Sequence, residues 1–251
     1  TQSLFLLYDQ KSFKHDGAGQ SFEFKLDNYI PHIEAEVKLN DGEVLKGEFF
    51  LNTGAGTPLD FNTGFATTNV LVIRTGDHFS YPVAGLSKTE TMHYEGRVQN
   101  LAFGSFNFEN FPIGISTAKH GIQHNKKVAG IMGNKLLKRF DITFDYSRKR
   151  IHFSQNGLAD ESFKVNASGI YLQFDKEMKK ILVHRVYDDS PAKMAGIKQD
   201  AEILKVNGKA ASDYSLPELR KLLQDTSKQV ELTLNQMGEE TTVTLDLKSL
   251  I

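Results

Sequence analysis

The chain has 251 residues, which is long enough for one large or two small domains, each with its own hydrophobic core. With 39% hydrophobic and 24% charged residues, its composition is that of an ordinary globular protein. A formal net charge of −1, without a basic stripe, argues against nucleic-acid binding. The absence of cysteine excludes disulfides, thiol nucleophiles and Cys-ligated zinc, and no apolar run reaches the roughly 20 residues that span a bilayer.

The opening residues contain an apolar run at 4–8 followed by a Gly-bearing loop. This pattern distantly echoes residues 150–163, where a strand is also followed by such a loop. Two interpretations stay open. The likeness is a chance similarity of two short loops, or residues 1–23 are the end of an upstream lobe that this chain lacks.

Short strands are expected to dominate the first 153 residues. Apolar and polar residues alternate from 32 to 39, which predicts a half-buried strand, and the sequence NDGE at 40–43 predicts a hairpin turn into a strand at 44–51. Further strands are expected at 69–74, 97–104 and 111–116, and a flap hairpin at 76–96. The segment 127–153 predicts a strand, a turn at Gly133-Asn134, one short helix and a closing hairpin.

A polar stretch rich in Gly, Asn and Ser at 154–169 marks the predicted domain boundary. We therefore divide the chain into a first domain at 1–153, a linker at 154–165 and a second domain at 166–251. In the second domain, Ser215 and Glu218 are spaced as the capping box of a helix, and Met237-Gly238 predicts the turn of a final hairpin. The second domain is expected to be a small α+β unit.

Five short motifs of the second domain occur in the order typical of bacterial PDZ domains: SPA, AGI, ILKVNG, a helix and a hairpin. Residues 166–251 therefore resemble a PDZ domain, and peptides or protein C-termini are the partners that this implies. In that family a peptide adds as a strand between a sheet edge and a helix, and backbone amides hold its terminal carboxylate. The resemblance assigns the amide loop to Gly169, Ile170, Tyr171 and Leu172, and the groove helix to Leu216, Leu219, Leu222 and Leu223.

Two positions depart from the PDZ pattern. Asp200-Ala201 stands where the family usually has Gly-Asp, and Tyr171 stands where a second loop Gly is often found. The fold is expected to survive, because Asp adopts the turn conformation that Gly favours. Whether the groove accepts free C-termini stays open, as does the alternative that this module only packs against its neighbour.

A loop of the kind used in catalysis is suggested by the sequence GEFFLNTGAGTPLDF at 47–61. Asn52-Thr53-Gly54-Ala55 resembles the Asp-Thr-Gly-Ala/Ser signature of retropepsin-like aspartic peptidases. The sequence VAGIMGNKLLKRF at 128–140 resembles the apolar-apolar-Gly element and following helix of the same family. The likeness covers residues 24–153.

This second resemblance implies a mostly β protein: a retropepsin-like β-barrel lobe followed by the small α+β PDZ-like domain. It implies peptide-bond hydrolysis by two Asp carboxyls that share one proton and activate a water. Position 52 is then the catalytic position, with Thr53 as a brace between two such loops and Gly54 allowing close backbone approach. The implied substrate cleft includes Ala55, Gly85 and Gly133. Because one lobe supplies one acid, a second lobe is implied, either in a homodimer or in an upstream domain.

The amide at position 52 conflicts with that chemistry, because an Asn side chain does not ionise and cannot act as the base. Three explanations stay open: a natural pseudo-site, an engineered inactive version, or a lobe used for substrate binding. As written, the chain is expected not to cut, so its status as an enzyme is uncertain. The alternative function is a non-catalytic peptide-binding protein, a pseudoprotease or PDZ scaffold.

Weaker patterns suggest no further site. His120 and His124 have a zinc-compatible spacing, but Gly121 lies between them and no third ligand is placed, so we expect an exposed loop, no metal and no cofactor. The second Asn-Thr-Gly, at 62–64, is interpreted as a loop, and Asp60 as a surface or turn residue. No Gly-x-Ser-x-Gly elbow supports a serine hydrolase. The absent cysteine and the domain pairing suggest the bacterial periplasm or cell surface.

Overall fold

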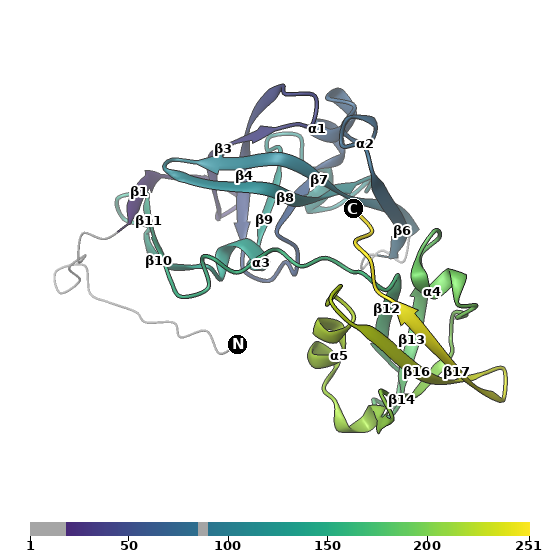
Figure 1. Ribbon diagram of the computed structural model, residues 1–251. Coiled ribbons are helices and arrows are strands. Elements are labelled where there is room, and N and C mark those ends of the chain that lie inside the picture. The colour runs from purple at the N-terminus through teal and green to yellow at the C-terminus, as the bar shows by residue number, and fades with distance from the viewer. Residues whose placement is uncertain (1–18, 85–89) are drawn as a thin grey trace.

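The computed structural model describes residues 19–84 and 90–251, and strands dominate it, as predicted (Figure 1). Its described strands form three sheets. Two sheets and the first hydrophobic core make up residues 20–155, which we call the β unit. The third sheet, with a second core, lies at 167–247. The apolar run at 4–8 and the predicted cleft residue Gly85 lie outside the described residues.

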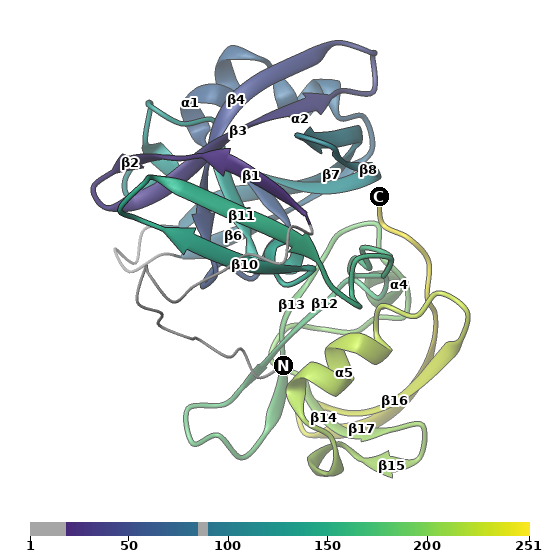
Figure 2. The ribbon, with the colours of Figure 1, turned by 90° about the vertical axis from the view of Figure 1, so that its left-hand side faces the viewer.

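The larger sheet of the β unit has the strand order β2-β3-β4-β9-β5-β8-β7-β6. These strands are β2 (Lys25–Asp27), β3 (Ile30–Lys38), β4 (Val44–Asn52), β5 (Leu59–Phe61), β6 (His78–Ala84), β7 (Glu90–Phe103), β8 (Phe106–Ser116) and β9 (Gly130–Gly133). The smaller sheet has the order β1-β11-β10, made of β1 (Gln20–Glu23), β11 (Arg150–Gln155) and β10 (Phe140–Asp145). Figure 2 shows β1, β11 and β10 side by side, so the residues assigned to an upstream lobe partly belong to this sheet.

Strand β9 is inserted between β4 and β5, parallel to the first and antiparallel to the second. Two glycines make this possible. A Cβ atom on Gly130 would lie 2.0 Å from the Asp60 carbonyl oxygen, and one on Gly133 would lie 2.1 Å from the Thr57 carbonyl oxygen. No side chain fits in these two places, so glycine is required by the close approach of backbone to backbone.

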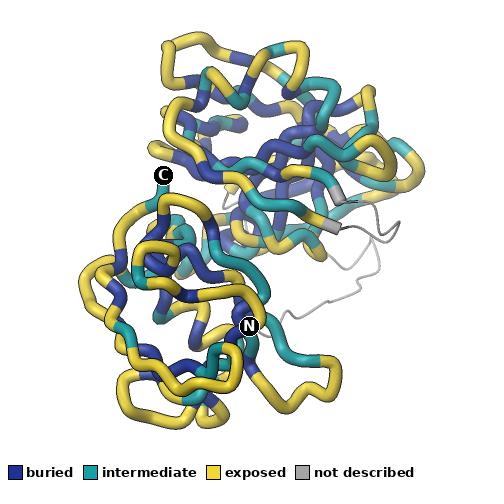
Figure 3. The backbone as a smooth tube through the Cα atoms, turned by 90° about the vertical axis from the view of Figure 1, so that its right-hand side faces the viewer, coloured by how far each residue is buried: buried dark blue, intermediate teal, exposed yellow. Residues whose placement is uncertain are grey.

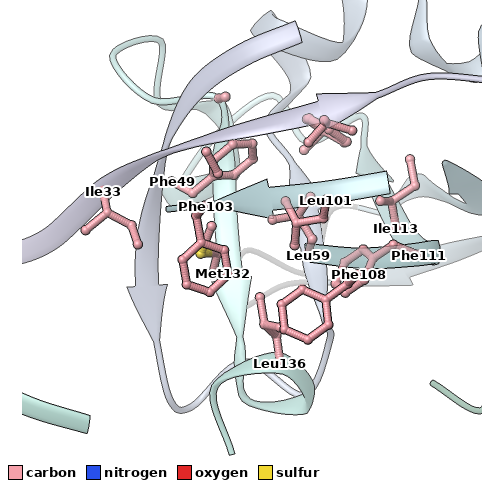
Figure 4. Close-up of a cluster of buried hydrophobic side chains, with 14 of the residues drawn as sticks. Ile33, Phe49, Leu59, Leu101, Phe103, Phe108, Phe111, Ile113, Met132 and Leu136 are labelled. Atoms are coloured by element: carbon pink, nitrogen blue, oxygen red, sulfur yellow. The ribbon is translucent and has the colours of Figure 1, made fainter. Parts of the chain in front are cut away.

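Phenylalanine rings fill much of the core between the two sheets of the β unit (Figure 4). Phe106 and Phe140 lie 4.9 Å apart between ring centroids, and Phe103 and Phe153 lie 5.5 Å apart. Aromatic pairs at such distances add stabilisation beyond the burial of their area. This explains how a chain with 18 Phe residues keeps most of them away from water.

Short helices replace two of the predicted irregular or extended segments. The helices of the β unit are α1 (Thr63–Thr68), α2 (Leu71–Arg74), the 3₁₀ helix η1 (Ile122–His124) and α3 (Asn134–Leu137). The strand predicted at 69–74 is wrong, because Val70 adopts a left-handed conformation with φ of 53° and starts α2 instead. Packing of the fully buried Leu71 overrides the strand propensity of its β-branched neighbours.

The second Asn-Thr-Gly is also not a free loop. Asn62 is fully buried and its amide donates to the carbonyls of Asn125 and Val128, at 3.1 and 3.3 Å. The Thr63 hydroxyl bonds to the Ala118 carbonyl at 2.8 Å, and α1 follows. Side-chain hydrogen bonds to distant backbone therefore turn this tripeptide into a structural anchor.

The segment after β11 packs against the β unit through Arg139. The buried guanidinium of Arg139 donates to four carbonyls of this segment, those of Leu158, Ala159, Glu161 and Ser162. It also lies 3.7 Å from the ring centroid of Phe163, which itself packs edge-on against Phe111 at 4.7 Å. A polar, loop-like sequence is thus held in place by one cation.

The third sheet has the order β12-β13-β14-β16-β17, with β15 paired to β14. Its elements are β12 (Ile170–Phe174), β13 (Ile181–Val186), α4 (Pro191–Met194), β14 (Glu202–Val206), β15 (Lys209–Ala210), η2 (Ala211–Asp213), α5 (Leu216–Leu222), β16 (Gln229–Gln236) and β17 (Glu239–Asp246). The predicted capping box of α5 and the turn at Met237-Gly238 are confirmed. Asp200 adopts a φ of 64°, the left-handed turn conformation expected of it.

The two units meet through aromatic rings. Tyr187 stacks on Phe79 and Tyr81 of β6, with centroid distances of 4.8 and 5.2 Å. Both units contain buried residues as well as exposed ones (Figure 3). Among the described residues, no helix is long and apolar enough to cross a membrane.

Replacing Gly133 by Ala should destabilise the protein by about 1–3 kcal/mol, because the new Cβ collides with the Thr57 carbonyl and the strands must separate. Gly56→Ala is the matched control, since nothing lies within 4 Å of a Cβ at Gly56. Urea unfolding followed by circular dichroism measures both changes. Equal midpoints for the two variants would contradict the close packing of β9.

Candidate functional site

The loop that follows β4 is held tightly against β9 and α3. Asn52 pairs with Gly133 in the parallel register of the two strands. The Ala55 carbonyl accepts a hydrogen bond from the Asn134 amide at 2.7 Å, and the Gly133 amide donates to the Pro58 carbonyl at 3.0 Å. The structure therefore brings Asn52, Ala55 and Gly133 together.

The side chain of Asn52 has a local structural use. Its Oδ1 accepts the Gly54 N–H at 2.9 Å, and its backbone carbonyl accepts the Ala55 N–H at 3.2 Å. Asn52 is half-buried, whereas Thr53 and Gly54 are exposed. The amide thus closes a turn at the end of β4, which is a common role of Asn.

A buried acid and a buried imidazole lie together on the far side of β9. Asp60 on β5 and His93 on β7 are 5% and 6% exposed, and Asp60 Oδ1 lies 3.6 Å from His93 Nε2. Gly114 on β8 leaves room for both groups, because its Cβ would lie 2.1 Å from Asp60 Oδ1. The Gln123 amide donates to Asp60 Oδ2 at 3.3 Å.

Burial dominates the electrostatics of this pair. It raises the pKa of Asp60 to about 6, and it lowers the pKa of His93. The interpretation of Asp60 as a surface residue is therefore wrong. The sequence did contain a signal, because Asp60 lies between two large apolar residues, Leu59 and Phe61. Both are fully buried in the structure.

The loop before β12 forms hydrogen bonds to its own side chains. Asn166 Oδ1 accepts the N–H groups of Ser168 and Gly169, at 3.0 and 2.9 Å. Ser168 Oγ accepts the Ile170 N–H at 3.0 Å. Gly169 has a φ of 80°, and its Cβ would lie 2.0 Å from Ser190 Oγ, so no other residue fits there.

Strand β12 is an edge strand, and α5 lies beside it. From α5, Arg220 donates to the Leu172 carbonyl at 2.9 Å and lies 5.6 Å from the ring centroid of Tyr171. Tyr171 is 42% exposed. Sequence reasoning missed Arg220 and Asn166. Helical spacing was a signal for the first, since Arg220 lies four residues after Leu216.

The remaining predicted groove residues divide by burial. Four of them belong to the core: Ile170, Leu172, Leu219 and Leu223, which are 1–4% exposed. Leu216 and Leu222 are half-buried and pack against that core. Of the predicted helix positions, Leu216 and Leu222 are thus the ones with appreciable exposed surface.

Residues 182–236 match the family model of the PDZ domain. This chain contains a PDZ domain. The match begins within β13 and ends with β16, so it includes α5, and β12 precedes it. Comparison with curated proteins gives no significant match.

Among solved structures, the chain is similar to HtrA-type proteases and to a processing protease. The HtrA-type protease AlgW with decapeptide is 13% identical, over 85% of this chain and 75% of that one, with a TM-score of 0.33. The serine endoprotease from Yersinia pestis is 21% identical, over 68% of this chain and 61% of that one, with a TM-score of 0.31. The photosystem II D1 C-terminal processing protease is 25% identical, over 36% and only 25% of its own chain, with a TM-score of 0.32. TM-scores this low assign no activity to the present chain.

The prediction of aspartic-peptidase function is wrong. The solved structures to which the chain is similar include HtrA-type proteases and a serine endoprotease, and none of the three named above is an aspartic peptidase. The chemistry at position 52 agrees, because Asn52 Oδ1 accepts the Gly54 N–H and an amide does not ionise, so Asn52 cannot act as half of a pair of acids that share a proton.

The free energy of unfolding of Asp60→Asn should increase relative to that of the wild type as the pH rises from 4 to 7. The raised pKa means that folded Asp60 holds its proton between pH 3.8 and about 6 while the unfolded chain has released it, so wild-type stability falls as the pH rises through that window. The Asn variant lacks this loss of unfolding free energy, which is about 3 kcal/mol for a pKa shift of this size.

Urea unfolding of both proteins across this pH range measures the difference. His93, whose lowered pKa favours folding as the pH rises, contributes in the opposite direction in both proteins. Parallel profiles for wild type and variant would contradict the burial of an ionisable Asp60.

Proposed function

We propose that this chain is a peptide-binding protein whose PDZ domain takes an extended segment of a partner as an additional strand on β12. The observation that carries this proposal is the edge of β12 beside α5, which pairs with no other described strand and has the Leu172 carbonyl turned toward the helix. An exposed edge of this kind offers main-chain hydrogen bonds to a further strand, and neighbouring side chains select its sequence. The match of residues 182–236 to the PDZ family supports it.

The division of the chain into domains at 1–153 and 166–251, with a linker between them, is part of this proposal. The two separate hydrophobic cores support it. The linker differs from a flexible connection, because Arg139 and Phe163 hold it against the β unit. The β unit is then a platform for the PDZ domain.

We propose the retropepsin-like likeness for the fold of the β unit alone. The insertion of β9 between β4 and β5, with Gly133 beside the Asn52 loop, supports it. No peptidase activity follows from it. The predicted second lobe loses its basis, since it was inferred only to supply a second Asp. A periplasmic or cell-surface location remains a proposal that the absence of cysteine supports.

Leu216→Lys should weaken peptide binding at least tenfold, because a charged side chain replaces the half-buried apolar residue at the start of α5. Lys221→Ala is the matched control. Lys221 is exposed and lies about 140° around the helix from Leu216, so its loss should change affinity less than twofold.

The measurement is binding to a library of ten-residue synthetic peptides, each displayed both with a free C-terminus and with an amidated one. Fluorescence anisotropy then gives the Kd of each peptide that binds, for the full chain and both variants. If no peptide of either form binds the wild-type chain, the proposed function is wrong.

A further inference from the structure

We propose that the segment bound on β12 is an internal stretch of its partner that carries an acidic side chain, rather than a free C-terminus, and that Arg220 selects this side chain. The inference rests on the proposed function and specifies its ligand. Two sets of hydrogen bonds carry it: one closes the loop before β12, and the other occupies the free edge of the strand.

The first set occupies the N–H groups at the start of the loop that would hold a terminal carboxylate. A PDZ domain that binds C-termini holds the carboxylate with consecutive backbone N–H groups of this loop. Here the N–H groups of Ser168 and Gly169 both point to Asn166 Oδ1, and that of Ile170 points to Ser168 Oγ. The Asn166 amide oxygen thus stands in for a carboxylate oxygen. A second, charged oxygen brought to the same place would be desolvated without compensation.

The second set places Arg220 where the incoming strand must bind. Alternate residues of a strand direct their carbonyls to the same edge. The Gly169 carbonyl accepts the Tyr187 N–H at 2.8 Å, whereas the carbonyls of Ile170 and Leu172 bond to side chains on the opposite edge. Asn166 Nδ2 donates to the Ile170 carbonyl at 2.8 Å, and Arg220 donates to the Leu172 carbonyl.

Strand addition must therefore release Arg220 from β12. A peptide N–H replaces the guanidinium at the Leu172 carbonyl, and the guanidinium remains charged because Arg does not lose its proton in proteins. It lies over the exposed ring of Tyr171, which also lies 5.8 Å from the His184 ring between centroids. A carboxylate side chain on the peptide gives the released guanidinium a bidentate partner, which a neutral side chain cannot do as well.

The first experiment compares the two ends of the peptide. Ten-residue peptides of alternating Thr and Val, with one Glu at each position in turn, are measured as free acids and as C-terminal amides by fluorescence anisotropy with the full chain. We expect the acid and amide of each peptide to bind within twofold of each other. Binding of the acid forms more than twofold tighter would overturn the proposal while leaving the proposed peptide-binding function intact.

Variants at Asn166 test the closed loop itself. Asn166→Ala frees the N–H groups of Ser168 and Gly169, so the acid forms should gain at least fivefold over the amides. Asn166→Asp keeps the acceptor oxygen and adds negative charge, and it should show no such gain. A gain in neither variant would contradict the role of Asn166. If Asn166→Ala fails to fold, the wild-type comparison still decides.

The second experiment replaces the peptide Glu by Gln at the best-binding position. For the wild-type chain we expect at least a fivefold loss of affinity. Arg220→Gln should remove this preference, and Arg220→Lys should restore part of it, because a charge remains but the bidentate fork is lost. An unchanged Glu preference in Arg220→Gln would overturn the assignment of Arg220. Failure of all peptides to bind would instead overturn the proposed function from which this inference starts.

Discussion

The insertion of β9 between β4 and β5 is the constraint on which the β unit depends. It brings three backbones so close that Gly130 and Gly133 admit no side chain. The polar residues of interest lie on either side of this strand. Asn52 pairs with its last residue, and Asp60 pairs with Ile131 in its middle. Position in the fold therefore decides the role of each residue: Asn52 closes a turn at the end of β4, and Asp60 is a buried, weakly acidic carboxyl.

The PDZ domain resolves a conflict that every edge strand faces. A free edge invites unwanted pairing with other chains, yet a peptide-binding strand must keep its edge accessible. Here the chain covers the edge with side chains rather than with another strand, through Asn166 at one end and Arg220 further along. Side chains exchange partners more readily than a paired strand does. The same contacts that protect the edge thus determine which ligand displaces them.

How much the sequence could predict depends on the range of the interactions involved. Features that depend on residues close in the chain are predicted correctly, among them the capping box at Ser215 and the left-handed conformation of Asp200. The buried Asp60 was misread because its environment comes from β7 and β8, far along the chain. The helix at 71–74 was missed because burial of Leu71 overrides local propensity. At the Asn52 loop, a short motif was recognised in the chain, but the function inferred from it was wrong.

Arg97 on β7 links the β unit to both ends of the PDZ domain. Its guanidinium donates to the carbonyls of Phe163 and Ile251, both at 3.4 Å, one before and one after the PDZ domain. Arg97 therefore contacts the chain on both sides of the PDZ domain, in addition to the Arg139 contacts before it and the Tyr187 stack within it. A domain attached at both ends has less freedom to reorient than a domain on one tether. Any change in the angle between the two units must break the Arg97 hydrogen bonds or the Tyr187 stack on Phe79 and Tyr81.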